Sequence, residues 1–309
     1  MGVMIDGTYQ VEDPGPGTTV QGHYERARST LRDMGLSDDP SRYHLYVAWN
    51  CPWAHRALLV RAALDLPITL SIARPARTDQ GWVFDAEGPF ADLLLGVRAL
   101  HEVYARQTPA YTGRITVPVL WDKQTGQIVN NESADIARML SEVFDPERRL
   151  IPAAQLEEID RWNAHIHKAI NNGVYRAGFA RTQAAYDEAV HALFDALDGL
   201  EAHLVHNDTL TGRAVTEADL RLFPTLARFD VAYHYAFKCN TRRLQDYPNL
   251  WDYARALYAL PGVAETVKPD IYKAGYFSKS ELRNPLGIVP AGPSINWTEP
   301  TTRSLKWPS

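Results

Sequence analysis

The sequence predicts an α/β domain followed by an all-helical domain. Two strand-like runs, 43–48 and 67–73, flank a helix-like run at 54–64, which gives a β-α-β unit of about 30 residues. A hairpin pattern over 116–129 follows it, with Thr125-Gly126 as the turn. From residue 156 onward the apolar residues recur at three- and four-residue spacing, which is typical of helices.

Composition along the chain indicates where these domains begin and end. Residues 1–42 are rich in Gly, Pro, Asp and Arg and predict an irregular N-terminal arm. The α/β domain is expected over 43–145, with a long insertion at 74–113. The helical domain is expected over 153–269. Residues 270–309 are Pro-rich and aromatic, and predict an irregular C-terminal tail.

Within these domains the apolar spacing predicts individual helices. The insertion is expected to contain a helix over 93–104, and a further helix is expected from Asn131-Glu132-Ser133 through Val143. Thr216 followed by Asp219 resembles a capping box at the start of a helix. The expected helices of the second domain span 156–169, 183–203, 219–233 and 249–259, with a short one from Pro261.

The bulk composition excludes several function classes. With 45% hydrophobic and 22% charged residues, the 309-residue chain is typical of a soluble globular protein. Its formal net charge of −5 argues against binding a phosphate backbone, so no nucleic-acid partner is expected. No apolar run approaches the roughly 20 residues that span a bilayer, and no export signal is visible. Two cysteines in such a chain fit a reducing compartment, so we expect a cytoplasmic protein.

The most informative segment is Asn50-Cys51-Pro52-Trp53-Ala54-His55, between a predicted strand and a predicted helix. Pro52 suits the first helical position, which places Cys51 at the helix start. The unpaired N–H groups and positive dipole end at that point favour a thiolate, so we expect Cys51 to be a nucleophile with a lowered pKa. The alternative is a small buried residue before a proline. Cys239 has no such surroundings and is expected to be a structural thiol.

A cysteine followed by proline at the end of a first strand is the position that thioredoxin-like redox proteins use. In their dithiol form a second cysteine follows three residues later, where this chain has Ala54. A thiol from outside the motif must therefore resolve a mixed disulfide on Cys51, and glutathione is the abundant cytosolic supply. Val117-Pro118 at the start of a third strand is expected to be cis, the alternative being an ordinary edge-strand proline.

Glu132 and Ser133 open a predicted helix and offer both charge and hydrogen bonds to a ligand. The backbone N–H groups and the hydroxyl suit a carboxylate, and the acid suits an ammonium group. The γ-glutamyl end of glutathione carries both, although an N-cap with nothing bound is the alternative. The histidines lack partners at ligand spacing and the glycines form no nucleotide-binding pattern, so neither a metal nor a nucleotide is expected.

The sequence resembles the glutathionyl-hydroquinone reductases, the omega-like Xi class of glutathione transferases. The resemblance extends from about residue 22 to residue 293. The runs that carry it in the α/β half are Arg42–Val47, Cys51–Arg56, Gly81–Phe84, Thr116–Asp122 and Ile128–Ser133. Those in the helical half are Thr216–Phe223, Arg228–Asp230, Phe237–Asn240 and Asp246–Trp251.

The resemblance implies the glutathione transferase architecture, a thioredoxin-like N-terminal domain plus an all-α C-terminal domain, and a homodimer. It implies Cys51 as the nucleophile. The residues implied to bind glutathione are Trp82, Arg114, Ile115, Thr116, Val117, Glu132 and Ser133. It also implies three tyrosines, Tyr175, Tyr233 and Tyr276, that donate a proton to a departing aromatic and stabilise the thiolate. The segment Ala274-Gly275-Tyr276-Phe277 departs from the family pattern, in which a histidine usually precedes a pair of tyrosines.

The activity that follows is a two-step thiol transfer. Cys51 is expected to take glutathione from a glutathionyl-hydroquinone, and a second glutathione then releases oxidised glutathione. Two neighbouring alternatives use the same cysteine: a glutathione-dependent thioltransferase or dehydroascorbate reductase, and an aryl-ether lyase. A non-catalytic transferase-like binding module is the alternative from another class.

Overall fold

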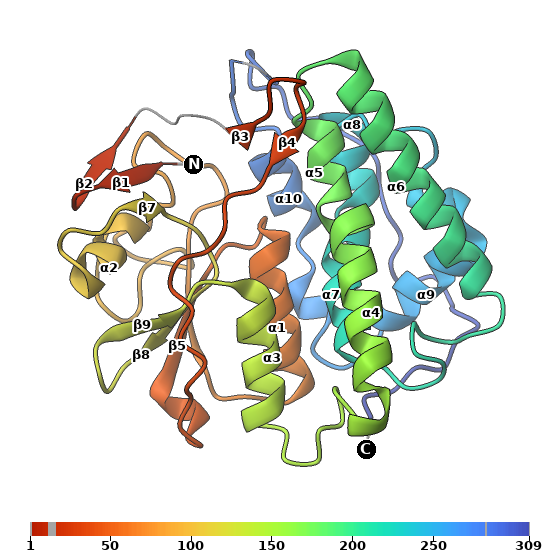
Figure 1. Cartoon of the computed structure of the whole chain (residues 1–309), viewed down its shortest axis with the longest axis horizontal. Helices are drawn as coiled ribbons and strands as arrows, with labels where there is room; N and C mark the ends of the chain where they lie inside the picture. The colour runs from red at the N-terminus through yellow and green to blue at the C-terminus, as the bar shows by residue number, and fades with distance from the viewer. Residues whose placement is uncertain (1, 12–16, 282, 309) are drawn as a thin grey trace. The chain divides into compact units, whose positions relative to one another are not determined.

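The computed structural model describes residues 2–11, 17–281 and 283–308, which form two units (Figure 1). The first unit comprises residues up to Gly17 together with Ala27–Phe144, and the second comprises Thr18–Arg26 together with residues from Asp145 onward. The first unit has a mixed α/β, thioredoxin-like fold and the second is helical. The N-terminal arm is therefore shared between the two units, and residues 12–16 of the expected arm lie outside the described residues.

The central sheet of the first unit has the strand order β6-β5-β8-β9. β5 (Tyr43–Val47) runs parallel to β6 (Thr69–Ile72) and antiparallel to β8 (Val119–Asp122), which pairs in turn with β9 (Gln127–Asn130). All residues of β5, which lies between β6 and β8, are buried, the polar His44 included. The helices α1 (Pro52–Ala63) and α3 (Ser133–Val143) pack together beside this sheet, and α2 (Leu100–Gln107) packs on β9 (Figure 1).

The helix of the insertion begins later than the sequence pattern predicts. Residues 93–97 wind around the carboxylate of Asp92, which accepts hydrogen bonds from the N–H groups of Leu94, Leu95 and Val97. Glu102 then accepts from the N–H of Ala99 at 2.8 Å and so caps a helix that starts at Leu100. A local carboxylate competes with helical hydrogen bonding here, which the apolar spacing of this segment does not reveal.

Short strands occupy parts of the arm that the composition predicts to be irregular, so that expectation was wrong there. β1 (Val3–Ile5) lies between β2 (Thr8–Gln10) and β7 (Gly113–Arg114) in a three-stranded sheet. β3 (Gly17–Thr18) and β4 (Tyr24–Glu25) form a two-stranded sheet. The long-range pairing of β1 with β7 creates order where local sequence shows none.

The second unit is helical, and α4, α6, α7 and α9 lie at or near the predicted ranges, whereas α5 and α8 were not predicted. Figure 1 shows α5 and α6 side by side, and these two helices pack on each other. The bounds are α4 (Leu156–Ile166), α5 (Gly173–Gly178), α6 (Gln183–His203), α7 (Glu217–Leu226), α8 (His234–Ala236), α9 (Pro248–Tyr258) and α10 (Pro269–Tyr276). π-Helical turns are η3 (His167–Asn171) and η4 (Phe229–Tyr233). The 3₁₀ turns are η1 (Pro40–Arg42) in the first unit, and η2 (Ala153–Gln155), η5 (Leu244–Asp246) and η6 (Ala264–Thr266) in the second.

Further elements differ from the expectation, and the short helix expected from Pro261 is only the 3₁₀ turn η6. The predicted helix over 219–233 is interrupted after α7, which contains Pro224 and is followed by the wider turn η4. A proline within a helix lacks the N–H that the regular pattern needs, and such sites favour kinks and π turns. Residues 270–276 of the expected irregular tail belong instead to α10, which has Pro269 at its first turn.

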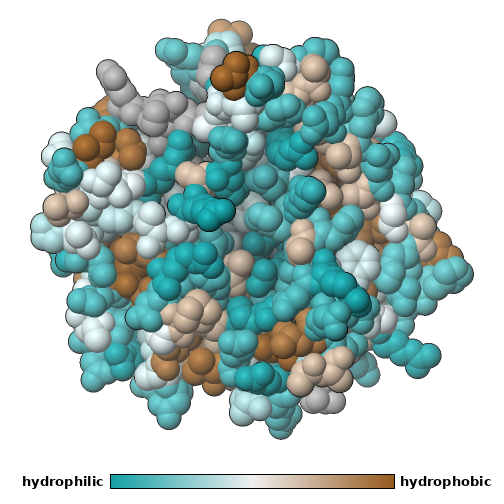
Figure 2. All heavy atoms as spheres, in the orientation of Figure 1, coloured by the Kyte–Doolittle hydropathy of each residue, from teal (hydrophilic) through white to brown (hydrophobic). Residues whose placement is uncertain are grey.

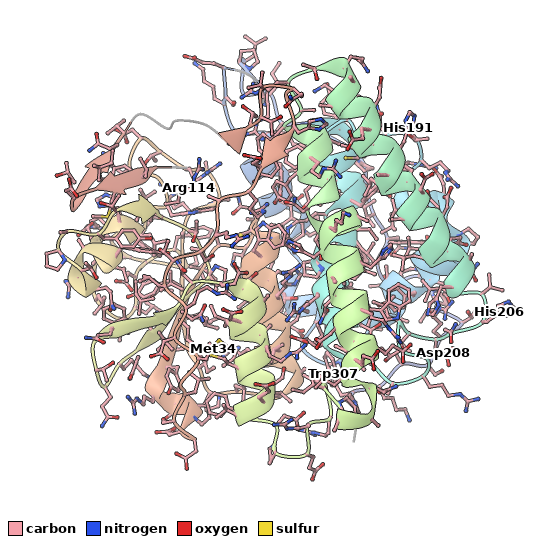
Figure 3. All side chains as sticks on the ribbon, viewed as in Figure 1. Met34, Arg114, His191, His206, Asp208 and Trp307 are labelled. Atoms are coloured by element: carbon pink, nitrogen blue, oxygen red, sulfur yellow. The ribbon has the colours of Figure 1, made fainter. Side chains whose placement is uncertain are left out.

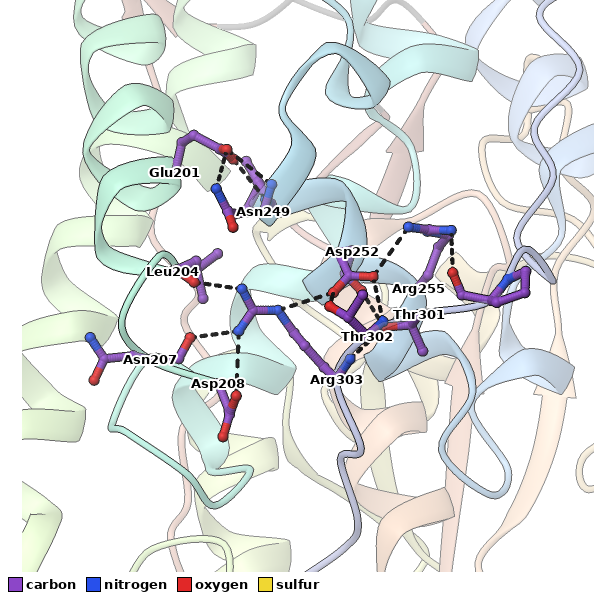
Figure 4. Close-up of polar contacts among 12 residues, drawn as sticks. Glu201, Leu204, Asn207, Asp208, Asn249, Asp252, Arg255, Thr301, Thr302 and Arg303 are labelled. Atoms are coloured by element: carbon purple, nitrogen blue, oxygen red, sulfur yellow. Dashed lines mark hydrogen bonds and ion pairs between the residues drawn. The ribbon is translucent and has the colours of Figure 1, made fainter.

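The segment after α10 is attached to the helical unit by polar contacts (Figure 4). The guanidinium of Arg303 donates to the carbonyls of Leu204 at 2.5 Å and Asn207 at 2.6 Å, just past the end of α6. Asp252 on α9 accepts hydrogen bonds from the N–H and hydroxyl of Thr302 at 3.0 and 2.6 Å. The tail is therefore extended but held in place. On the face seen in Figure 2, polar side chains predominate and apolar ones form small, separate patches.

Candidate functional site

Cys51 lies where the sequence predicts, at the N-cap of α1. Its carbonyl accepts the first helical hydrogen bond, from the N–H of His55 at 3.1 Å, and Pro52 occupies the first helical position. The side chain is half-buried, and its thiol donates to the carbonyl of Val117 at 3.6 Å. A sulfur at a helix N-terminus faces partial positive charge, which favours the thiolate.

The Val117-Pro118 peptide bond is cis, as predicted. It immediately precedes β8, and Val119 of that strand is opposite Tyr46 of β5. Because β5 and β8 are antiparallel, the end of β5 and the beginning of β8 meet at one edge of the sheet. Cys51 follows one strand and Val117 precedes the other, which explains the contact between thiol and carbonyl.

Glu132 is the N-cap of α3, and Ser133 begins that helix. The Glu132 carboxylate accepts from the N–H of Ala134 at 3.2 Å and from the hydroxyl of Ser29 in the arm at 2.9 Å. Ser133 is buried, and its hydroxyl accepts a hydrogen bond from the guanidinium of Arg56 at 3.4 Å. A carboxylate, a hydroxyl and a buried cation therefore surround the start of α3.

A contact that the sequence analysis missed holds two segments of this unit together. The hydroxyl of Tyr104, on α2, donates to the carbonyl of Thr116 at 2.9 Å and accepts from the side-chain amide of Asn131 at 3.1 Å. Tyr104 is fully buried, and burial raises the pKa of its phenol to about 12. The segment before Pro118 is thus tied to the segment before α3. Tyr104 lies 12 residues from Thr116 and 27 from Asn131, so no local motif indicates the link.

The remaining predicted glutathione-binding residues lie in the insertion and around β7. Trp82 is buried, with the guanidinium of Arg77 5.4 Å from its ring centre. Its indole Nε1 has no hydrogen-bond partner within the described part of the chain, and an acceptor on a ligand would supply one. Arg114, labelled in Figure 3, is half-buried on β7. Ile115 is buried and donates its N–H to the carbonyl of Gly2 at 3.3 Å.

The three predicted tyrosines meet in the helical unit. The hydroxyl of Tyr276, on α10, lies 2.9 Å from that of Tyr175 on α5 and 3.1 Å from that of Tyr233 on η4. Tyr276 is therefore the central member, although the surrounding sequence departs from the family pattern. Tyr175 and Tyr276 are half-buried, whereas Tyr233 is fully buried. Burial, followed by the two neighbouring phenols, raises the pKa of Tyr233 well above its usual value.

This tyrosine cluster can act as a proton donor. Each phenol carries one proton and can donate one hydrogen bond. Two bonds link the three hydroxyls and use two protons, so the third proton can be donated to a group outside the cluster. A half-buried hydroxyl at one end of such a chain can give up its proton while the neighbouring hydroxyl turns to stabilise the oxygen left behind.

The second cysteine lies in a different environment. Cys239 is fully buried, and burial raises the pKa of its thiol far above the usual value. Its environment suits a packed, unreactive thiol. The described ranges hold no group of three or more His, Cys, Asp or Glu side chains placed to bind one metal ion. Across the same ranges, each helix is too short or too polar to cross a lipid bilayer.

Comparison with known proteins agrees with both units. Residues 50–143 match the model of the glutathione S-transferase N-terminal domain, and residues 183–256 match that of the C-terminal domain. The chain is 44% identical to the glutathionyl-hydroquinone reductase PcpF of Sphingobium chlorophenolicum, covering 95% of this chain and 97% of PcpF. It is 40% identical to the glutathionyl-hydroquinone reductase YqjG of Escherichia coli K12, covering 99% of this chain and 100% of YqjG.

Solved structures give the same result. The Xi-class glutathione transferase of Natrialba magadii superposes with a TM-score of 0.88 at 38% identity, over 98% of this chain and 96% of that protein. The glutathione-bound structure of YqjG superposes with a TM-score of 0.84 at 40% identity, over 98% and 99% of the two chains. Fold, sequence and family models agree, and the chain belongs to the glutathionyl-hydroquinone reductases, the Xi class of the glutathione S-transferase family.

Proposed function

We propose that this protein reduces glutathionyl-hydroquinones to hydroquinones at the expense of glutathione. The observation that carries the proposal is the half-buried thiol of Cys51 at the start of α1, with Ala54 in place of a resolving cysteine. Such a thiol can form one mixed disulfide but cannot release it alone. The reductases PcpF and YqjG, related over nearly the whole chain, support glutathionyl-hydroquinones as the substrate class.

The reaction consists of two balanced steps. In the first, the Cys51 thiolate attacks the glutathione sulfur of the substrate and forms a sulfur–sulfur bond. The bond between that sulfur and the ring carbon breaks, its electron pair stays on the carbon, and a proton converts that carbon to C–H. The aromatic ring is thereby reduced, and the two sulfurs are oxidised to a disulfide.

In the second step, a free glutathione thiolate attacks the glutathione sulfur of the mixed disulfide. Oxidised glutathione leaves, and Cys51 returns to its thiolate. The net change converts one glutathionyl-hydroquinone and one glutathione into one hydroquinone and one oxidised glutathione.

The glutathione moiety is bound, in this proposal, by the residues around the sheet edge and the start of α3. The N–H groups at the start of α3 and the Ser133 hydroxyl suit the γ-glutamyl carboxylate, and the Glu132 carboxylate suits the ammonium group. Backbone groups of residues 114–117 suit the peptide portion, and Trp82 offers a buried donor. The glutathione-bound structure of YqjG supports glutathione as the ligand of this fold.

The proton of the first step is assigned to the tyrosine cluster. Tyr175 and Tyr276 are half-buried and so can contact a ligand, and Tyr233 supports Tyr276 from the buried side. A phenol is a suitable general acid for a ring carbon that gains an electron pair, and a positioned acid contributes about 10²–10⁴-fold to a rate. We also propose that the protein is cytoplasmic and acts as a homodimer. Sedimentation of the purified chain would test the dimer.

Replacement of the thiol tests the function directly. Cys51→Ser is expected to abolish reduction of the glutathione adduct of 1,4-hydroquinone, with circular dichroism and melting temperature unchanged. Cys239→Ser is the matched control and is expected to keep the activity, because that thiol is fully buried. Wild-type turnover by Cys51→Ser would refute the scheme. Turnover of disulfides or dehydroascorbate without hydroquinone release would favour a thioltransferase instead.

A further inference from the structure

The arm contributes a cation to the tyrosine cluster. Arg26 is the last residue of the segment Thr18–Arg26, which belongs to the helical unit. Its guanidinium carbon lies 4.8 Å from the centre of the Tyr175 ring and 5.7 Å from that of Tyr24. A cation within about 6 Å of a ring centre is attracted to the electron-rich face of that ring.

A second contact of Arg26 reaches the helix that carries Tyr175. Its Nε donates to the side-chain oxygen of Asn172 at 3.0 Å, and Asn172 is the N-cap of α5. The Asn172 carbonyl in turn accepts from the N–H of Tyr175 at 3.0 Å. Arg26 therefore contacts both the ring of Tyr175 and Asn172, the N-cap of the helix that carries Tyr175.

The arm itself is anchored where it carries Arg26. The carbonyl of Gly22 accepts from the N–H of Arg181 at 2.9 Å, and the hydroxyl of Thr182 donates to the carbonyl of Gln21 at 2.9 Å. Gly22 has a φ of +88°, and an added Cβ there would lie 2.9 Å from the Thr182 methyl, so glycine suits this close approach. The segment that leads to Arg26 is thus held on the helical unit by contacts that do not involve the Arg26 side chain.

Other charged and titratable groups near Tyr175 are mostly paired with each other. On α6, Glu188 forms ion pairs with Arg176 at 2.7 Å and with His23 at 3.8 Å. Arg283 lies over the rings of Phe179 and Phe237, which contact Tyr175 edge-on or by stacking. The neighbouring titratable groups are Tyr24 and His23 of the arm, Arg176 of α5, Glu188 of α6, Tyr233 of η4, Tyr276 of α10 and Arg283 of the tail.

We propose that Arg26 is a positioning residue for Tyr175 in the release of the aromatic product. Its cation holds the ring in place and stabilises the negative charge that develops on the phenol oxygen as the proton departs. This inference rests on the proposed role of Tyr175 as a proton donor. Nothing in the arm's sequence marks Arg26 for this role, because the contact depends on how residues 18–26 lie on the helical unit.

The test compares variants of the full chain in two reactions. One is reduction of the glutathione adduct of 1,4-hydroquinone, which needs a proton on carbon. The other is reduction of the mixed disulfide of glutathione and 2-mercaptoethanol, which uses Cys51 but releases a thiol. Arg26→Met is expected to lower kcat/KM in the first reaction about 5- to 30-fold, which corresponds to a cation–π contact of about 1–2 kcal/mol. The second reaction should stay within about twofold of wild type, since no ring carbon takes up a proton in it.

The pH profile separates an electrostatic role from a structural one. A proton donor stops working as pH rises through its pKa, which gives the pH–rate profile a falling alkaline limb. A nearby cation lowers the pKa of a phenol, so loss of the cation should move the alkaline limb of the first reaction to higher pH by about one pH unit. Arg26→Gln, which keeps a donor for Asn172 but lacks the charge, should show the same move. Arg26→Lys keeps the charge and should keep the wild-type limb. Arg28→Met, an exposed arginine two residues further along the arm, is the matched control and should match wild type in both reactions.

Each result decides the inference. An unmoved limb in Arg26→Gln and Arg26→Met, or an equal loss in both reactions, would overturn it. Tyr175→Phe, measured in parallel, shows whether the role of Tyr175 or only that of Arg26 is wrong. Wild-type reduction by Tyr175→Phe would overturn the role of Tyr175, and the role of Arg26 with it. If Arg26→Met does not fold, the comparison of Arg26→Gln with Arg26→Lys decides the same question.

Discussion

Removal of the Tyr104 hydroxyl should weaken both the fold of the α/β unit and its binding of glutathione. Tyr104→Phe keeps the ring but deletes the donor to Thr116 and the acceptor for Asn131, at 2.9 and 3.1 Å. A third bond, which the hydroxyl accepts from the N–H of Thr116 at 3.4 Å, is lost as well. Each bond contributes about 1 kcal/mol, and the buried Asn131 amide is left without this acceptor. The free energy of unfolding should therefore fall by about 2–4 kcal/mol.

The same variant has a signature in the pH dependence of stability. The pKa of Tyr104 is about 12 in the folded protein against 10.0 for a free phenol. For an acid whose pKa is raised by folding, the contribution to stability is complete below pH 10 and is lost as pH rises toward 12. Two pKa units correspond to about 3 kcal/mol. Tyr104→Phe should lack this part of the alkaline loss, so its stability should converge on that of wild type above pH 10.

Urea titrations at pH 8 and at pH 11 measure both effects, and the KM for glutathione reports on the site. We expect a lower urea midpoint at pH 8, a smaller difference at pH 11, and a KM raised about 3- to 10-fold, as about 1 kcal/mol of lost positioning would give. Tyr258→Phe, in the helical unit, serves as the control. A wild-type midpoint and KM in Tyr104→Phe would refute the view that this hydroxyl holds the two segments together.

Further predictions concern the tyrosine cluster, the arm and the tail. Tyr276→Phe breaks both hydrogen bonds of the cluster and should lower the rate of hydroquinone release about 10- to 100-fold. Tyr233→Phe breaks one bond and should lower that rate less. Equal losses in rapid-quench assays would contradict the central place of Tyr276. Ser29→Ala removes a 2.9 Å bond to Glu132 and should raise the KM for glutathione a few-fold with kcat unchanged, whereas a change confined to kcat would contradict this role. Arg303→Met loses two hydrogen bonds to carbonyls just past the end of α6 and should lower the melting temperature by about 5 °C or more. Arg213→Met replaces an exposed arginine and serves as the control. If calorimetry shows that both variants melt at the wild-type temperature, these tail contacts contribute no stability.

Local patterns in the sequence were sufficient to predict the strands of the central sheet and the position of Cys51. A strand, a proline at the first helical position and an apolar helix are features of neighbouring residues, so Cys51 could be placed at the N-cap of α1 from the sequence alone. The same holds for α6, whose bounds, Gln183–His203, coincide with the predicted range. The cis bond before Pro118 was also predicted, from its place at the start of a strand.

Contacts between distant residues could not be predicted in this way. Tyr104 resembles any aromatic residue on an apolar helix face until its hydroxyl is found beside Thr116 and Asn131. The pairing of β1 with β7 and the contact of Arg26 with Tyr175 depend in the same way on the folded chain. α10 was missed because it has only 8 residues, among them Gly275, and so shows too few turns of apolar spacing.

The proposed role of Cys51 is tested most directly by measuring the mass of the intact enzyme during turnover. With the glutathione adduct of 1,4-hydroquinone and no free glutathione, one equivalent of hydroquinone should be released. The intact protein should gain the mass of one glutathionyl group in place of the thiol hydrogen. Peptide mapping should place this adduct on Cys51, and addition of glutathione should remove it as oxidised glutathione. Release of hydroquinone from an enzyme that carries no glutathione, or an adduct on Cys239, would contradict the proposed mechanism.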